Sequence, residues 1–144
     1  MPKKSLEYLR ILDANLNRAR EGMRVCEEVA RFLLNDAALT RRCQRVRYRF
    51  RSAAAAVPRL KLLEARDSLR DVGRPALRGK SSSHRFSTDL VSANAQRAQE
   101  ALRVLEEFYR FYSVRQSKAW GTLRFQVYSI EKDLLTKLSA LRHR

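Results

Sequence analysis

An internal repeat constrains the fold of this chain more than any other feature. Residues 13–32 read DANLNRAREGMRVCEEVARF and residues 92–111 read SANAQRAQEALRVLEEFYRF, at a constant offset of 79, and eleven of these 20 positions are identical. A weaker match at an offset of 77, Val46-Arg47-Tyr48 against Leu123-Arg124-Phe125, extends the similarity further along each half. The chain is therefore expected to contain two copies of one structural unit.

The apolar residues in and after each copy recur at helical spacing. This pattern predicts helices at about 6–34 and 38–57, separated by the stop and cap signal Asn35-Asp36, and at about 88–112 and 117–141. Each half then forms an antiparallel hairpin, which cannot bury its apolar stripe alone. We predict an all-α fold, a four-helix bundle made of two duplicated hairpins (about 5–57 and 88–141) joined by a long central loop at about 66–87. The length of 144 residues favours a single domain over 1–144.

The positive charge of the chain is large and unevenly distributed. There are 31 Lys and Arg against 15 Asp and Glu, for a formal net charge of +16, and no acid occurs between Ala37 and Leu63. Three interpretations stay open: a nucleic-acid footprint, a field that attracts small anionic substrates, and an ordinary solvated surface. A nucleic-acid partner is the less favoured, because the duplicated polar residues described below are expected to face inward, whereas residues that contact a duplex face outward.

Neither cysteine chemistry nor a membrane span is indicated. Cys26 and Cys43 each lie in an apolar-periodic segment, so we expect both to be small core residues without a disulfide. The first residues carry no apolar stretch, and no apolar run is long enough to span a bilayer. We therefore expect a cytoplasmic protein.

The repeated helix places polar residues on its apolar face. With about 100° per residue, Asn15 lies in the middle of that face and Arg18 on its flank, and Asn94 and Arg97 repeat the arrangement. Gly22 lies on the same face and permits close approach of a backbone or a ligand. One interpretation is that these residues satisfy one another in the core. The other is a central pocket in which Arg clamps a phosphate and Asn reads a heterocycle.

The repeated acids divide between that face and the outer surface. The wheel places Glu21, Glu28 and their counterparts at the border of the inward face. It predicts a solvated position for Arg24, Glu27, Arg31, Arg103, Glu106 and Arg110.

The central segment Ala65-Arg66-Asp67-Ser68-Leu69-Arg70-Asp71-Val72-Gly73 gives a second indication of a site. Asp67 and Asp71 are four residues apart, so on a final helical turn they would share one face, and Gly73 would allow a turn with positive φ. Two close carboxylates can hold Mg²⁺ that is bound to phosphates. The alternative is a helix end whose acids pair with neighbouring arginines.

Three strings together resemble a known family. They are ILDANLNRAREGMRV at 11–25, ARDSxxDVG at 65–73 and ANxxRAxEALRVLEE at 93–107. The chain resembles, over nearly its whole length, the small helical hydroxymethylpyrimidine-phosphate kinases of thiamine biosynthesis, a domain often fused to thiamine-phosphate synthase. The segment from Arg74 to Arg85 departs from the more acidic loop that we expect for this family.

The resemblance implies a transferase that uses ATP and Mg²⁺ to phosphorylate 4-amino-5-hydroxymethyl-2-methylpyrimidine phosphate to the diphosphate. The sequence contains neither a P-loop nor a GxGxxG motif, so arginines would have to hold the phosphates. We expect Asp67 and Asp71 to bind the metal, with the following catalytic set: Arg18, Arg66, Asp67, Asp71 and Arg97. The expected substrate-binding set is Asn15, Arg18, Gly22, Arg47, Asn94, Arg97 and Arg124. Thiamine-phosphate synthase is an implied partner, and a homo-oligomer is left open. The alternatives to an enzyme are a basic helical module that binds nucleic acid and a non-catalytic protein that binds the pyrimidine phosphate.

Overall fold

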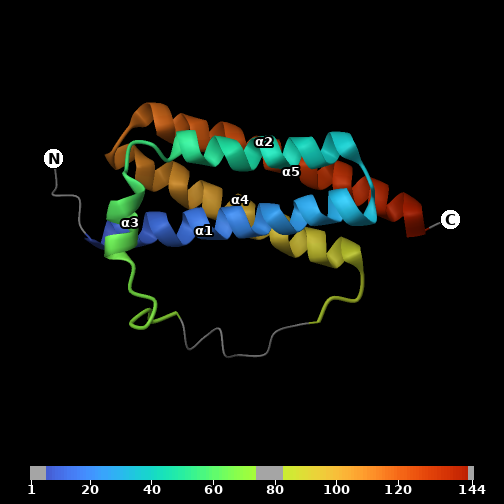
Figure 1. Cartoon of the computed structure of the whole chain (residues 1–144), viewed down its shortest axis with the longest axis horizontal. Coiled ribbons are helices and arrows are strands. Elements are labelled where there is room, and N and C mark those ends of the chain that lie inside the picture. Colours follow the sequence, from blue (N-terminus) through green and yellow to red (C-terminus); the bar gives the residue numbers. More distant parts are fainter. Residues whose placement is uncertain (1–5, 74–82, 143–144) are drawn as a thin grey trace.

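The computed structural model describes residues 6–73 and 83–142, and these fold into a helical bundle without any strand (Figure 1). The first half contains α1 (Leu6–Glu28), which continues as a π-helical turn η1 (Val29–Leu33), followed by α2 (Ala37–Ala53) and the short α3 (Arg59–Ala65). The second half contains α4 (Ser87–Phe108), a 3₁₀ turn η3 (Tyr109–Phe111) and α5 (Val114–Arg142). The all-α prediction is confirmed, and α1, α2, α4 and α5 are its four long helices.

The connection between α1 and α2 follows the predicted stop and cap signal. Asn35 adopts a positive φ of 49°, which ends the first helix. Asp36 then caps α2, because its Oδ1 accepts a hydrogen bond from the Leu39 N–H at 2.9 Å. Its other carboxylate oxygen pairs with Lys137 of α5, so this corner is also tied to the second half.

The predicted end of the second helix is wrong, because α2 ends at Ala53 and not at about 57. The segment after Pro58 forms the separate helix α3, which the apolar pattern did not predict. Helix α4 begins at Ser87, within one residue of the predicted start, and Asp89 accepts the Phe86 N–H from inside the first turn. Of the divergent segment from Arg74 to Arg85, residues 74–82 lie outside the described part of the chain, and these are also the residues of the predicted central loop at 66–87 that are not described.

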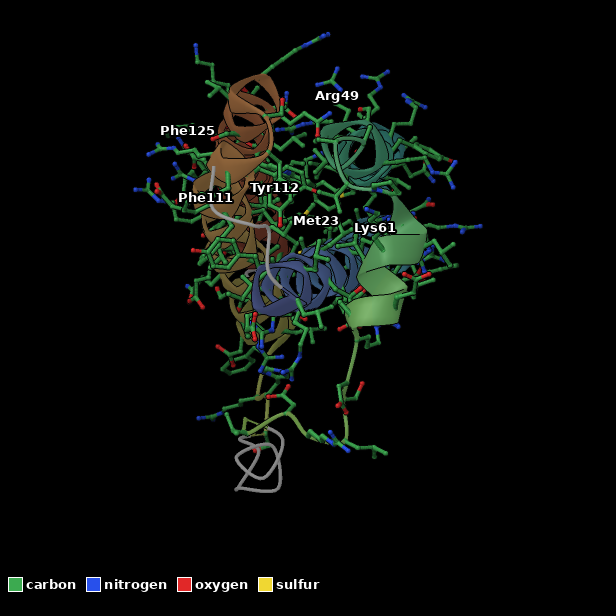
Figure 2. The ribbon with its side chains drawn as sticks, turned by 90° about the vertical axis from the view of Figure 1, so that its left-hand side faces the viewer. Met23, Arg49, Lys61, Phe111, Tyr112 and Phe125 are labelled. Atoms are coloured by element: carbon green, nitrogen blue, oxygen red, sulfur yellow. The ribbon has the colours of Figure 1, made fainter. Side chains whose placement is uncertain are left out.

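The core runs along the interior of the bundle, where α1 packs against α4 and α2 packs against α5 (Figure 1). Figure 2 looks along the bundle and shows Met23 between the helices, with Arg49 and Lys61 on the outside. Phe50, Tyr109 and Trp120 form an aromatic cluster in this core, and the Tyr109 hydroxyl donates to the Ala54 carbonyl at 3.2 Å. None of the described helices is both long and apolar enough to cross a bilayer.

Both cysteines are core residues, as predicted. Cys26 and Cys43 are fully buried and not disulfide-bonded. Burial raises the pKa of each thiol to about 12, so both stay protonated and unreactive near neutral pH.

Candidate functional site

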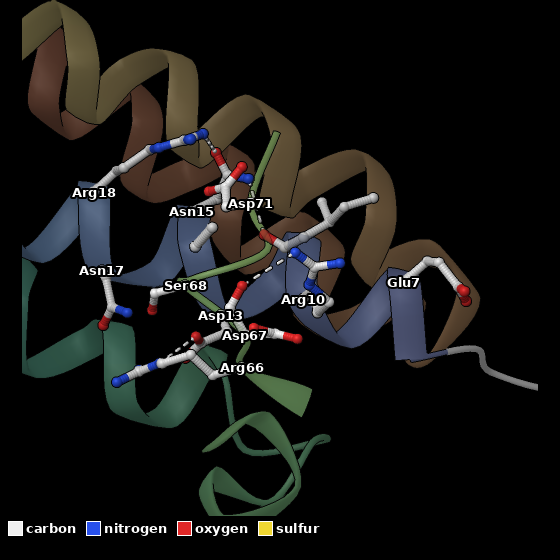
Figure 3. Close-up of a pocket in the computed structure, with 12 residues that line it drawn as sticks. Glu7, Arg10, Asp13, Asn15, Asn17, Arg18, Arg66, Asp67, Ser68 and Asp71 are labelled. Atoms are coloured by element: carbon white, nitrogen blue, oxygen red, sulfur yellow. Dashed lines mark hydrogen bonds and ion pairs between the residues drawn. The ribbon is translucent and has the colours of Figure 1, made fainter. Parts of the chain in front are cut away.

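A polar pocket of about 440 Å³ lies between the first half of α1 and the segment that follows α3 (Figure 3). Helix α1 supplies one wall, and residues 66–71 cross over it to supply the other. The lining side chains are mostly charged or amide groups: Glu7, Arg10, Ile11, Asp13, Ala14, Asn15, Asn17, Arg18, Arg66, Asp67, Ser68 and Asp71.

A bidentate ion pair fixes the two walls to each other. Arg66 donates from Nε to Asp13 Oδ2 and from Nη2 to Asp13 Oδ1, each at 2.7 Å. The Asp13 side chain is only 8% exposed and that of Arg66 38% exposed, so the pair seals one edge of the pocket. The hydrogen bonds from Arg66 to Asp13 raise the pKa of the guanidinium, which stays charged. The two parallel hydrogen bonds keep the guanidinium and the carboxylate coplanar, and they fix the position of the chain just after α3.

The loop acids lie in turns rather than on a helix. Helix α3 ends at Ala65, before Asp67 and Asp71, so the prediction of a shared final helical turn is wrong. Asp67 accepts the Arg70 N–H at 3.2 Å through Oδ1, and its carbonyl accepts a hydrogen bond from Arg10 Nη2 at 3.4 Å. Asp71 accepts the Gly73 N–H at 2.8 Å. Gly73 does not adopt the positive φ that we expected.

Asn15 and Arg18 bring the repeat motif into the same pocket. The Asn15 amide donates to the Ile11 carbonyl at 2.9 Å, and its Oδ1 accepts a long hydrogen bond of 3.4 Å from Arg18 Nη1. Asn15 is 5% exposed, whereas Arg18 is exposed at the rim. In the described part of the chain no carboxylate lies within ion-pair distance of Arg18. Five predicted residues therefore meet here: Asn15, Arg18, Arg66, Asp67 and Asp71.

The second copy of the motif does not reach this pocket. Asn94 repeats the local geometry of Asn15, since its amide donates to the Leu90 carbonyl at 2.9 Å, but neither Asn94 nor Arg97 lines the pocket. Gly22 does not contact a ligand site either. A Cβ at this glycine would lie 2.6 Å from the Asn94 carbonyl oxygen, so Gly22 serves the close packing of α1 on α4. The expected common cavity of both motifs is therefore wrong, because the pocket at Asn15 and Arg18 is lined by α1 and residues 66–71 and by no residue of α4.

Arg47 and Arg124, both expected to bind substrate, are engaged in matching ion pairs. Arg47 Nη2 lies 2.6 Å from Glu27 Oε1, and Arg124 Nη2 lies 3.0 Å from Glu106 Oε2. The prediction that Glu27 and Glu106 are solvated is also wrong, because their side chains are 2% and 16% exposed. The offsets of 79 between the acids and 77 between the arginines show that this ion pair is itself part of the duplication.

A metal site at Asp67 and Asp71 would have few protein ligands. No group of three or more His, Cys, Asp or Glu side chains in residues 6–73 and 83–142 is placed to hold a metal ion. Asp67 and Asp71 line one pocket but use carboxylate oxygens in their own turns. One or two carboxylates can hold Mg²⁺ together with the phosphates of a ligand, so a metal at Asp67 and Asp71 stays a prediction, and we derive no step through it.

Sequence reasoning missed Asp13 and Arg10, which position the loop. Asp13 is not a repeated position, because it corresponds to Ser92 in the second copy. At about 100° per residue it lies nearly opposite Asn15, away from the apolar face that the repeat marks. Only the structure shows that it pairs with an arginine 53 residues away.

The fold and site define a class: an all-helical protein with a duplicated hairpin, whose first copy carries a polar, arginine-containing pocket. The chain belongs to the ThiD2 family, whose model matches residues 10–133. It is similar to the thiamine-phosphate synthases of Nostoc punctiforme (41% identity over 126 residues, 88% of this chain and 35% of the relative) and Rhodopirellula baltica (36% over 140 residues, 97% and 37%). The thiamine-phosphate synthase of Gloeobacter violaceus is 37% identical over 142 residues. No solved structure matches the chain.

These relatives correct the expected reaction. The chain spans little more than a third of the length of the curated relatives that it matches. They are named for the synthesis of thiamine phosphate, which is a different reaction from the ATP-dependent phosphorylation of a pyrimidine phosphate. The kinase assignment, which rested on resemblance alone, is therefore wrong, whereas its placement in thiamine biosynthesis agrees with the relatives.

Proposed function

We propose that this chain is an enzyme domain of thiamine biosynthesis and that the pocket of Asp13 and Arg66 binds a phosphorylated aminopyrimidine. The pathway is supported by the names of the relatives, each of which matches most of this chain. The observation that carries the site is the convergence of five predicted residues, Asn15, Arg18, Arg66, Asp67 and Asp71, from two segments about fifty residues apart.

The charges that remain unpaired in the pocket match the two ends of such a ligand. Arg66 is neutralised by Asp13, but Arg18 at the rim has no acid partner among the described residues and is free to bind a phosphate. On the loop side, Asp71 uses one carboxylate oxygen in its turn. The other oxygen can accept a hydrogen bond from an exocyclic amine of the pyrimidine ring.

The pocket is suited to hold a ligand in one orientation. Its walls come from a helix packed in the core and from a loop that Arg10 and Arg66 fasten to that helix. Side chains held in this way lose little further freedom when a ligand binds, which favours positioning of the reacting group.

The repeat supplies a matched test of this proposal. Titration calorimetry with 4-amino-5-hydroxymethyl-2-methylpyrimidine phosphate should show binding that is about 10- to 100-fold weaker in Arg18→Gln, because one charge-assisted hydrogen bond contributes about 1.5–3 kcal/mol. Arg97→Gln removes the same charge from the equivalent position outside the pocket, and it should bind like the parent. The phosphate-free alcohol should bind weakly to all three proteins.

Two results would reject the proposal. Equal weakening in Arg18→Gln and Arg97→Gln would show that the ligand responds to overall charge and not to this pocket. If Arg18→Gln and Asp71→Asn each bind the pyrimidine phosphate with the affinity of the parent, the ligand binds elsewhere on the molecule.

A further inference from the structure

A second concave site lies where α1, the end of α2 and α3 meet, and it is lined by three arginines. Arg20 of α1, Arg51 near the end of α2 and Arg59 at the start of α3 border a hollow of about 520 Å³. It shares no lining residue with the pocket of Asp13 and Arg66. On a helix with about 100° per residue, Arg20 lies about 20° from Asp13 and roughly opposite Arg18, so the second site adjoins the Asp13 edge of the first pocket and faces away from its Arg18 rim.

The three arginines are not neutralised within the described structure. No carboxylate of the described residues lies within ion-pair distance of Arg20, Arg51 or Arg59. The acid whose charge acts favourably on Arg20 is Asp13, but both of its oxygens already accept hydrogen bonds from Arg66. Burial and the charges of Arg59 and Arg51 lower the pKa of Arg20, which agrees with like charges held close together.

The base of this site is apolar and well packed. Leu16, Val57 and Leu62 line it, and each is at most 4% exposed. Arg20 is costly in the free protein, since its half-buried guanidinium loses water and is repelled by Arg51 and Arg59, which are themselves exposed. A bound anion removes that cost, because each guanidinium fork can donate two hydrogen bonds to phosphate oxygens.

The repeat shows that this charge is specific to the first half. At the offsets of 79 and 77, Arg20 corresponds to Gln99 and Arg51 to Tyr128. Gln99 and Tyr128 also line a hollow together, but there Gln99 donates to Glu131 at 2.9 Å, and Arg124 is paired with Glu106. In the second half, the polar side chains of the equivalent hollow therefore have partners within the protein. In the first half, the arginines of the hollow keep an uncompensated positive charge.

We infer that the site of Arg20, Arg51 and Arg59 binds a small phosphorylated ligand, such as a diphosphate group, independently of the pocket proposed above. Three formal positive charges around one hollow match the charge of a diphosphate better than that of a single phosphate. A small anion is favoured over a nucleic-acid backbone because Arg20 is half-buried within the hollow, whereas a duplex reaches side chains that project from the surface.

The first test is titration with inorganic pyrophosphate at 150 mM NaCl. We expect at least 10-fold weaker binding in Arg20→Gln and in Arg51→Gln than in the parent. Arg115→Gln, which removes an exposed charge elsewhere, should leave pyrophosphate affinity unchanged. Equal loss in all three variants would overturn the inference, and so would displacement of pyrophosphate by duplex DNA at this salt concentration.

The second test uses stability and does not depend on the ligand having been identified correctly. Without anions, Arg20→Gln relieves repulsion, so its melting temperature should be equal to or above that of the parent. In pyrophosphate the order should reverse, because only the parent has the full site. If Arg20→Gln melts below the parent by the same margin in both solutions, Arg20 is a structural residue and the inference is wrong. Loss of this site and loss of the aminopyrimidine pocket are distinguishable, since each has its own arginine variant.

Discussion

At the scale of single residues, the ion pair of Glu27 and Arg47 should contribute strongly to stability. Glu27 is 2% exposed, and its other cationic neighbour, Arg24, lies at 4.0 Å. Arg47→Met would leave this carboxylate buried with a distant partner, and removal of one member of a buried pair costs about 3 kcal/mol or more. Urea unfolding should show this loss, whereas Arg45→Met, at an exposed position two residues away, should change stability by less than about 0.5 kcal/mol. A loss below about 1 kcal/mol for Arg47→Met would contradict the assignment.

Asp36 gives a prediction with a defined pH dependence. The Leu39 N–H, and then Lys137, hold the pKa of this carboxyl below its ordinary value. A group whose pKa is lowered by folding stabilises the protein above the unfolded pKa, near 3.9, and loses that contribution as the pH falls through the lower folded value. Asp36→Ala should therefore cost about 1 kcal/mol at pH 7, and less as the pH falls below about 4. Asp133→Ala, which removes an exposed ion pair with Arg42, should cost about 0 to 1 kcal/mol.

The limits of the sequence are visible at this scale. The wheel placed Asn15 correctly in the buried face, but it placed Glu27 in solvent, because a wheel records direction and not the partner that a neighbouring helix supplies. The partner, Arg47, lies on α2, and the crossing of α1 and α2 determines that the two side chains meet. The bidentate contact of Asp13 with Arg66 could not be predicted from the sequence for the same reason.

At the scale of helices, Gly22 sets how closely α1 and α4 can approach. Alanine at this position gains up to about 1 kcal/mol in helix propensity. Its Cβ, however, would lie 2.6 Å from a backbone oxygen of Asn94, so the helices would have to separate, which costs about 1–3 kcal/mol. We expect a net loss of stability for Gly22→Ala by urea unfolding. Gly121→Ala should cost less, because its Cβ would meet the movable carboxylate of Glu106 rather than a backbone atom. A more stable Gly22→Ala would show that the two helices are free to shift.

The order of the four long helices could be predicted from the repeat, because a duplicated amphipathic pattern leaves few other ways to bury two apolar stripes. The short helix α3 could not be predicted, since its seven residues carry too few periodic positions to be distinguished from a loop. That helix matters for both sites: Arg59 at its start borders one hollow, and Arg66 just past its end borders the other. The functional asymmetry of the two halves therefore comes from the connecting segment, which the repeat does not include.

At the scale of the whole molecule, the net charge of +16 should produce polyanion binding that is non-specific and sensitive to salt. Arg41, Arg45 and Arg49 are exposed on α2, where they can contact phosphates of a duplex, and none of them lines the pocket of Asp13 and Arg66. Contacts of this kind release counterions, so affinity falls by a factor of about 10³–10⁵ between 50 and 200 mM salt when six to ten phosphates are contacted. Fluorescence anisotropy with duplexes of unrelated sequence should give the same affinity for each, and little binding at 200 mM NaCl. Binding to the two arginine-containing pockets should persist at that salt concentration, because recessed pairs are screened less than exposed ones. Sequence-selective duplex binding that survives 200 mM NaCl would contradict this view and make the outer face of α2 the functional surface.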